Sequence, residues 1–367
     1  MRKLSTWTNS LNALFWARVV RSTALSAESL SAFRVVAGFF LLVTHTPFNW
    51  IASAPRALFN PPVLSLASLF DGFPGRAFFI ALDAVSLLSL ACLAMGIRAR
   101  TATIVYLLAA IVGQSFQYSF GKIDHPIMLY ALLGCMTFSG WGQHLAVLRD
   151  KQTKTGSTIR SLSLLSVLLC FAMFSAGFEK ALNWVDFDLK TNGFISWFRL
   201  GYYVYDRQFL LSHLVNYFPP LLLELFDYAA VALELSPLFF LLHSRQGWRV
   251  WLLIVCTFHL VNTLLLNIAF IENTMVYLAF IDFTWLYHKL RSWVSVFVIK
   301  RVVVGGFMVV VIAKGLFIFS TVSPLAFVTF EQLKMFWLCI GLFIWAGAIT
   351  VIAGSISMTG IKRPHYG

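Results

Sequence analysis

Three basic side chains, Lys180, His125 and His259, occur in apolar stretches of the sequence, where ionisable groups are rare. Burial disfavours the charged form of a lysine, so a buried amine can act as a base. Imidazoles gain and lose protons near neutral pH. These residue types together could abstract a proton from a substrate, provided that distant segments bring them to one place.

The segment 121–126 (Gly-Lys-Ile-Asp-His-Pro) has two interpretations. In the structural one, Asp124 caps a helix that carries Pro126 in its first turn. In the functional one, His125 points toward a cavity as a proton donor. The spacing alone favours the structural interpretation.

Lys180 closes an apolar run in which the small residues Ser175, Ala176 and Gly177 permit close helix packing. Lys180 either extends to the membrane interface beside an acid or points inward as a neutral base. His259 and Asn262 are three positions apart and share one helical face. An imidazole inside a bilayer is costly, which favours a function for His259.

The composition excludes a soluble enzyme, a disordered chain and a disulfide scaffold. Of the 367 residues, 59% are hydrophobic and 12% are charged, whereas soluble domains have about 25% charged residues. The net charge of +13 is scattered between apolar runs, so no nucleic-acid partner is expected. The sequence contains no CxxC or HExxH motif and no cluster of carboxylates on a single helix, so no metal site is expected. The five cysteines are expected to be buried.

The fold class predicted is an all-α integral membrane protein with about nine or ten transmembrane helices, because a span needs about 20 apolar residues. The candidate spans are roughly 30–50, 75–97, 101–119, 125–141, 160–181, 219–242, 249–271, 273–288, 302–322 and 335–357. The loop at about 52–74 is expected to be re-entrant or interfacial. With these spans, most Lys and Arg residues lie on the side of the termini, which predicts cytoplasmic N- and C-termini in the cell membrane. The membrane expected is a bacterial inner membrane.

The chain is accordingly divided into four parts and a loop. These are a cytoplasmic arm with an interfacial helix (1–29), a membrane domain (30–288) with an external lid loop (183–219), two further C-terminal spans (289–358) and a cytoplasmic tail (359–367). The predicted topology lets Lys180, His125 and His259 face one cavity on the non-cytoplasmic side. The ionisable residues within or beside the spans are Arg34, Asp83, Asp124, His125, Glu179, Lys180, Glu224, Asp227, Glu234, His259, Asp282 and Lys314.

Five stretches at about residues 30–285 resemble, in order, the HTTM family. This is the membrane domain shared by vitamin K-dependent γ-carboxylases and smaller bacterial relatives. The stretches are Phe33-Arg34 with Gly38, Gly121 to His125, Ser175 to Lys180 followed by Trp184, Glu234 to Pro237, and Phe258 to Asn262 followed by Phe270.

The resemblance implies an outward-facing site in which Lys180 is the catalytic base. His125 would assist carboxylation of a carbanion, and His259 would serve the epoxidation of a quinone. The implied cofactor is a reduced quinone of the vitamin K type, which acts with oxygen and carbon dioxide. Candidate substrate-binding residues in the matching stretches and beside them are Asp124, Asn262, Trp184, Glu179 and Arg34.

Two departures from the carboxylases affect this expectation. The carboxylases usually have Asn at the position of Asp124 and Lys at that of Glu179, and Glu179 would hold Lys180 as a charged pair. The chain ends soon after its last predicted span, so a peptide substrate would need a partner protein.

Three functions remain open at this stage. The first is a carboxylase-like or oxygenase-like membrane enzyme. The second is a non-catalytic membrane component that binds lipid or assists maturation or export of a partner peptide. The third, a transporter, is less favoured because the spans show no inverted halves.

Overall fold

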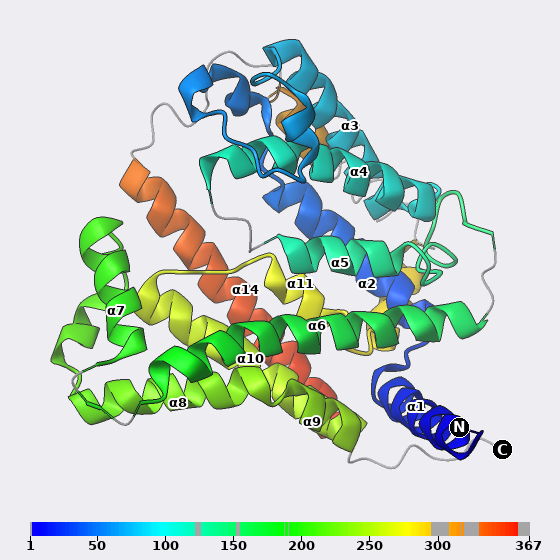
Figure 1. Cartoon of the computed structure of the whole chain (residues 1–367). Coiled ribbons are helices and arrows are strands. Elements are labelled where there is room, and N and C mark those ends of the chain that lie inside the picture. The colour runs from blue at the N-terminus through cyan, green and yellow to red at the C-terminus, as the bar shows by residue number, and fades with distance from the viewer. Residues whose placement is uncertain are drawn as a thin grey trace. The chain divides into compact units, whose positions relative to one another are not determined.

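The computed structural model describes residues 2–121, 126–151, 155–186, 188–189, 191–294, 308–316, 318 and 330–358. Every regular element of these residues is a helix (Figure 1), so the chain is an all-α polytopic membrane protein, as predicted. The chain divides into two compact units, and each is described by itself.

Six helices of the described residues are long and apolar enough to cross a membrane, and a bent pair of helices adds a seventh candidate. The prediction was about nine or ten spans. The six are Ala27–Ser53, Arg76–Met95, Ala99–Phe120, Arg160–Trp184, Arg245–Leu266 and Glu331–Ser357.

The bent pair is α8 (Pro220–Leu235) and α9 (Pro237–His243), which meet at an angle of 46°. Pro237 lacks the backbone N–H that would continue the helical hydrogen bonds, so the helix breaks at Ser236. The predicted span 219–242 therefore exists as two pieces.

The other three predicted spans do not correspond to long apolar helices among the described residues, each for a separate reason. In the stretch 125–141, the described helix is α5 (Ile127–Met136), which is too short to cross a bilayer. The stretch 273–288 holds α11 (Asn273–Leu278) and the start of α12 (Thr284–Val294), with Asp282 accepting the N–H of Thr284 between them. Most of 302–322 lies outside the described residues.

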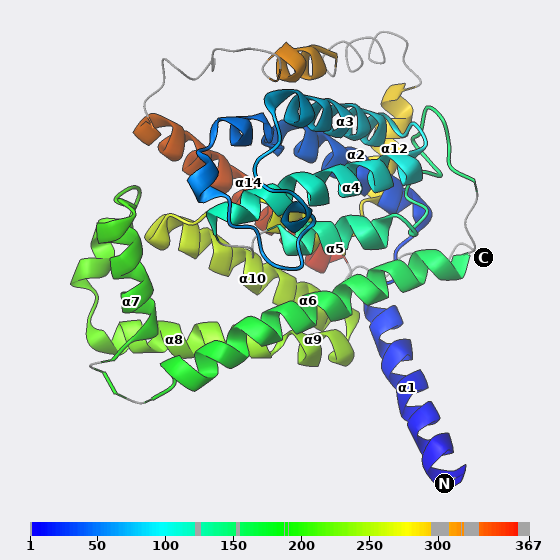
Figure 2. The same cartoon turned by 45° about the horizontal axis from the view of Figure 1, so that its top comes forward.

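The first unit comprises Met1–Ala24, Leu162–Ile281 and Val328–Gly367. Within it, α10 (Arg245–Leu266) packs lengthwise beside α14 (Phe330–Met358), as Figures 1 and 2 show. The stacked rings of Trp248 and Trp251 fill the interior side of α10. Its other helices are α1 (Arg2–Thr23), most of α6 (Thr155–Trp184), α7 (Gly193–Arg199), the π-helix η5 (Leu200–Val204), the 3-10 helix η6 (Ser212–Tyr217), α8, α9 and α11.

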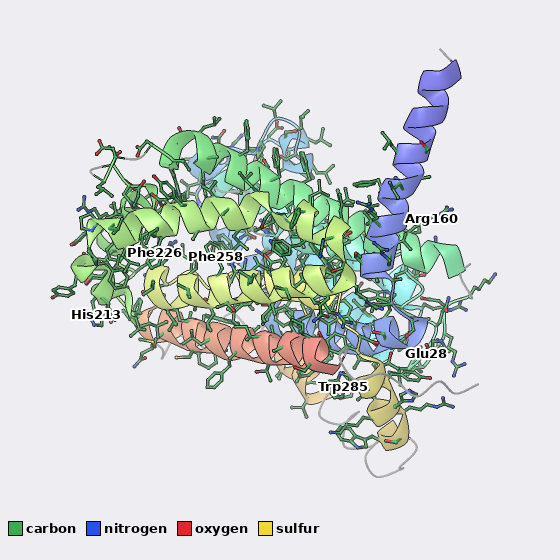
Figure 3. All side chains as sticks on the ribbon, turned by 90° about the horizontal axis from the view of Figure 1, so that it is seen from below. Glu28, Arg160, His213, Phe226, Phe258 and Trp285 are labelled. Carbon is green, nitrogen blue, oxygen red and sulfur yellow. The ribbon has the colours of Figure 1, made fainter. Side chains whose placement is uncertain are left out.

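The segment between α6 and α8 in this unit is mostly helical. Phe198 of α7, Val215 of η6 and Leu265 of α10 form a buried cluster, against which Phe226 of α8 also packs. Figure 3 labels Phe226 together with His213 of η6. The expected lid loop is thus folded onto the ends of α8 and α10.

The second unit comprises Leu25–Ser161 and Asp282–Phe327. α2 (Ala27–Thr44) and α4 (Ala99–Gln117) each pack on α3 (Arg76–Met95). The approach of α2 to α3 requires Gly38, because a Cβ at this position would lie 2.7 Å from Ala94 Cα. The remaining described helices are η1 (Asn49–Ser53), η2 (Arg56–Leu58), η3 (Leu66–Leu69), η4 (Tyr118–Phe120), α5, α12 and a helical stretch at 308–316.

Candidate functional site

Lys180 of α6 and Glu234 of α8 form an ion pair, in which the Lys180 ammonium donates to Glu234 Oε1. Gly177 makes this contact possible, because a Cβ there would meet Glu234 Cβ at 2.8 Å. Residues 177 and 180 lie on one helical face. The close approach of the two backbones therefore also places the amine on the carboxylate.

The Glu234 carboxylate is more deeply buried than its partner. The Glu234 side chain is 6% exposed and that of Lys180 is 25% exposed. Glu234 Oε2 is buried and has no hydrogen-bond partner among the described residues. Buried polar atoms are normally hydrogen-bonded, so this oxygen is an acceptor that a ligand hydroxyl could satisfy.

Glu179, the expected partner of Lys180, is exposed. Consecutive residues of a helix point in different directions, so Glu179 and Lys180 face different surroundings. The carboxylate beside Lys180 comes from the distant residue Glu234 instead. Two sequence signals pointed to Glu234: it is an acid in an apolar stretch, which needs a cationic or hydrogen-bonding partner, and it begins one of the stretches that resemble the HTTM family.

His259 of α10 is held by a second polar contact. Its Nε2 lies 2.8 Å from the hydroxyl of Tyr277 on α11. Both residues are buried, and the two rings are roughly parallel at 5.6 Å between centroids. This hydrogen bond fixes the orientation of the imidazole.

Trp345 of α14 covers the other side of the imidazole. Its ring stacks on His259 with centroids 4.9 Å apart and an interplanar angle of 17°. The indole N–H donates to the Ala269 carbonyl at 2.6 Å, which fixes the indole ring in turn. Neither Tyr277 nor Trp345 was marked in the sequence, because aromatic residues are too common in this chain to signal a site.

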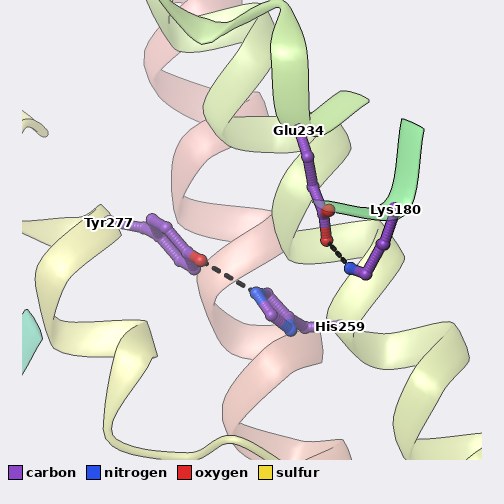
Figure 4. Close-up of polar contacts among 4 residues, drawn as sticks. All are labelled: Lys180, Glu234, His259 and Tyr277. Atoms are coloured by element: carbon purple, nitrogen blue, oxygen red, sulfur yellow. Dashed lines mark hydrogen bonds and ion pairs between the residues drawn. The ribbon is translucent and has the colours of Figure 1, made fainter. Parts of the chain in front are cut away.

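Figure 4 shows the two pairs in one close-up, with Lys180 and Glu234 beside His259 and Tyr277. The first unit therefore brings three buried groups, a carboxylate, an imidazole and a phenol, close to a partly exposed amine. Such a group of side chains can accept, donate and relay protons.

Asn262 is buried on the same face of α10 as His259. Its backbone carbonyl accepts the N–H of Asn267, which ends the helix in a left-handed conformation. The Asn267 side chain then accepts the N–H of Phe209 at 2.8 Å. This end of α10 thus holds the segment that precedes η6.

Trp184 connects Lys180 to the lid segment. The Lys180 ammonium lies 5.3 Å from the centre of the Trp184 ring, at cation–π distance. The same ring packs against Gly193, where a Cβ would meet it at 2.3 Å. Only glycine allows the first residue of α7 to lie this close to the indole.

Asp227 of α8 fixes the start of α7. Its two carboxylate oxygens accept the N–H groups of Gly193 at 2.9 Å and of Phe194 at 2.8 Å. In the preceding turn, the Thr191 hydroxyl and the N–H of Asp188 donate to Asp186 and lower the pKa of that carboxyl. The Asp227 carboxylate therefore attaches the first turn of α7 to α8.

Arg34, an expected substrate-binding residue, bonds to the protein's own backbone in the structure. It is completely buried in the second unit, where its guanidinium donates to the carbonyls of Leu93, Trp141 and Leu145. The donor fork of arginine matches several acceptors at once. Arg34 thereby joins the C-terminal end of α3 to the turns after α5.

His125 and Asp124 lie outside the described residues, so the predicted gathering of three basic groups is seen for Lys180 and His259 alone. No group of three or more His, Cys, Asp or Glu side chains in the described ranges could hold a metal ion. Comparison of the chain with family models, with curated proteins and with solved structures finds no match. The fold and the buried side chains define a multi-pass α-helical membrane protein.

Proposed function

We propose that this protein is a membrane enzyme that removes a proton from a lipid-soluble substrate, with Lys180 as the base. The observation that carries the proposal is the Lys180–Glu234 pair beside His259 and Tyr277. Ionisable groups inside a membrane protein are costly and usually serve a function. Four ionisable side chains at one site favour a role in proton transfer over a role in packing alone.

The ion pair supplies a route to a neutral amine. Transfer of the proton from Lys180 to Glu234 turns a pair of charges into an amine and a carboxylic acid. Apolar surroundings disfavour separate charges, so this transfer is easier there than in water. Lys180 then takes the substrate proton, while His259 accepts or donates a second proton with its ring held by Tyr277.

The HTTM resemblance supports a reduced prenyl quinone as the substrate or cofactor, in a carboxylase-like or oxygenase-like reaction. The site fits such a group, because Glu234 Oε2 offers a buried acceptor for a hydroxyl and the rings of Phe270 and Trp345 line His259. A reduced quinone with oxygen would supply the strong base that the family chemistry requires. Lys180 and Glu234 would bind its hydroxyl and take up the proton.

We further propose that the membrane is the cell membrane of a bacterium and that both termini are cytoplasmic. With the ten spans predicted from the sequence, most Lys and Arg residues lie on the side of the termini, which supports this orientation. The lid segment would then face outward, where a peptide delivered by a partner protein could meet the site.

The alternative function is a non-catalytic component that binds lipid or escorts a partner peptide. It is favoured by the exposed aromatic residues of the lid, such as Tyr203 and Tyr217. Tyrosines at a membrane interface also occur without catalysis. The two functions differ in whether Lys180 must lose a proton.

The test is Lys180→Arg in protein reconstituted in nanodiscs. Arginine keeps the positive charge beside Glu234 but is not a base at any ordinary pH. With a reduced prenyl quinone present, we expect oxygen consumption and incorporation of labelled carbon dioxide to fall about 10²–10⁴-fold, the usual contribution of a general base. The midpoint of thermal unfolding should stay close to that of the parent.

Glu234→Gln and Glu179→Gln form the matched control. Both remove one carboxylate charge, and only Glu234 contacts Lys180. The first should lose activity and the second should keep it. Equal activity in Lys180→Arg and the parent, or no turnover by the parent, would favour the non-catalytic component.

A further inference from the structure

An uncharged loop of the second unit presents bare apolar side chains. Residues 57–70 contain no Asp, Glu, Lys or Arg, and Arg56 and Asp71 stand at the two ends. At its tip, Val63 is 88% exposed, Leu64 100% and Leu69 80%. Contiguous apolar patches of this kind mark sites of contact with a membrane or another protein.

The backbone of this loop satisfies much of its own hydrogen bonding. The N–H of Ser65 donates to Pro62, that of Ser68 to Ser65 and that of Phe70 to Ala67. The Ser68 hydroxyl also donates to the carbonyls of Val63 and Ser65. Pro61 and Pro62 carry no N–H at all. A segment that enters an apolar phase needs this property, because lipid cannot bond to free backbone groups.

The base of the loop is held firmly. Ala67 is completely buried in a cluster with Ile51 and Phe116. The Phe70 ring packs edge-on against Phe116 with centroids 5.1 Å apart, and the Arg56 guanidinium donates to the Asp71 carbonyl at 3.1 Å. The exposed tip is therefore presented by a packed support.

The position of the loop points to the bilayer as its partner. It connects the membrane-spanning segments Ala27–Ser53 and Arg76–Met95, so both of its ends lie at a membrane surface. Trp50, just before the loop, is exposed, and tryptophans concentrate at the boundary between lipid and water. The spans on either side also expose apolar residues, such as Phe39 and Leu88.

A protein partner fits the loop less well. Each side of a stable protein complex buries about 800 Å², far more than three side chains at a loop tip provide. Polar residues also normally surround such an interface, whereas this loop has no charged residue along its length. A lipid surface needs neither a large area nor a polar rim.

We propose that residues 57–70 form a lipid anchor, in which Val63, Leu64 and Leu69 insert into the interfacial region of the bilayer. The anchor holds the ends of two spans at a fixed depth. This inference does not depend on the chemistry proposed for Lys180.

The test uses a nitroxide label at Leu64→Cys in the full chain, reconstituted in phosphatidylcholine vesicles. Cys92 and Cys339, the two partly exposed cysteines, are replaced by alanine. The same protein without an introduced cysteine is treated with the label to measure background labelling. Asp71→Cys, at the base of the same loop, is the matched control. Collision of the label with oxygen, which dissolves in lipid, is compared with collision with a water-soluble nickel complex.

We expect the label at position 64 to collide with the nickel complex several-fold less often than the label at position 71, and to collide more often with oxygen. Val63→Cys should behave like Leu64→Cys. Frequent nickel collisions at position 64 would show that the tip lies in water and would overturn the proposal. Protection from both reagents would also overturn it, because a protein surface would then cover the tip.

Discussion

At the scale of single residues, a buried arginine and a partly exposed lysine of this protein are neutralised in different ways. Arg34 is surrounded by backbone carbonyls, with donors to Leu93 and Leu145 among others, whereas Lys180 meets a carboxylate. Carbonyl oxygens stabilise a permanent charge but cannot accept a proton. A carboxylate can accept a proton from the ammonium, so Lys180 can become a neutral amine, whereas Arg34 stays charged.

We therefore expect Arg34→Lys to destabilise the protein by about 3–5 kcal/mol, because one ammonium cannot reach the several carbonyls that the guanidinium joins. Unfolding by a denaturing detergent measures the change. Arg160→Lys, at an exposed position, is the control and should change the stability by less than about 0.5 kcal/mol. Normal stability with lost substrate binding in Arg34→Lys would support the substrate-binding role expected from the sequence.

At the scale of elements, glycines decide which helices come close. Gly177 lets α6 approach Glu234 on α8, and Gly38 lets α2 approach Ala94 on α3. The site depends on the first of these contacts, because Lys180 follows Gly177 by one helical turn. A shift of α6 would move the amine away from the carboxylate.

Gly177→Ala should cost about 1–3 kcal/mol, the usual effect of overpacking, and should lower any activity that needs the ion pair. Gly354→Ala in α14 is the matched control, since a Cβ there meets nothing within 4 Å. Alanine should be neutral or stabilising by about 0.5–1 kcal/mol at position 354 because it favours helix formation. Equal melting temperatures for the two variants would contradict the close contact at Gly177.

At the scale of the whole molecule, the ten spans predicted from the sequence and the positions of Lys and Arg predict which side each loop faces. Thr191 precedes α7 in the proposed external lid, and Thr153 belongs to a segment proposed from the sequence to be cytoplasmic. A membrane-impermeant maleimide added to intact cells should modify Thr191→Cys and leave Thr153→Cys unmodified. Reaction at position 153 alone would reverse the proposed orientation.

Much of the architecture could be predicted from the sequence, because an apolar helix in lipid is specified by the length and composition of one segment. The predicted spans beginning near 30, 75, 101, 160, 249 and 335 each correspond to a long apolar helix. The break at Pro237 was missed, although proline is its direct cause. The length of the helix in the predicted span 125–141 was overestimated, because the apolar composition of this stretch did not show that the helix ends at Met136.

The sequence by itself determined that this chain is a helical membrane protein with rare ionisable residues in its interior, since both properties follow from local composition. Only the tertiary structure decided that Lys180 meets Glu234, 54 positions away, and that Trp345 covers His259. Pairings of this kind depend on where helices cross and how closely they approach. Small contacts such as that of Gly177 with Glu234 determine those crossings, and no single segment encodes them.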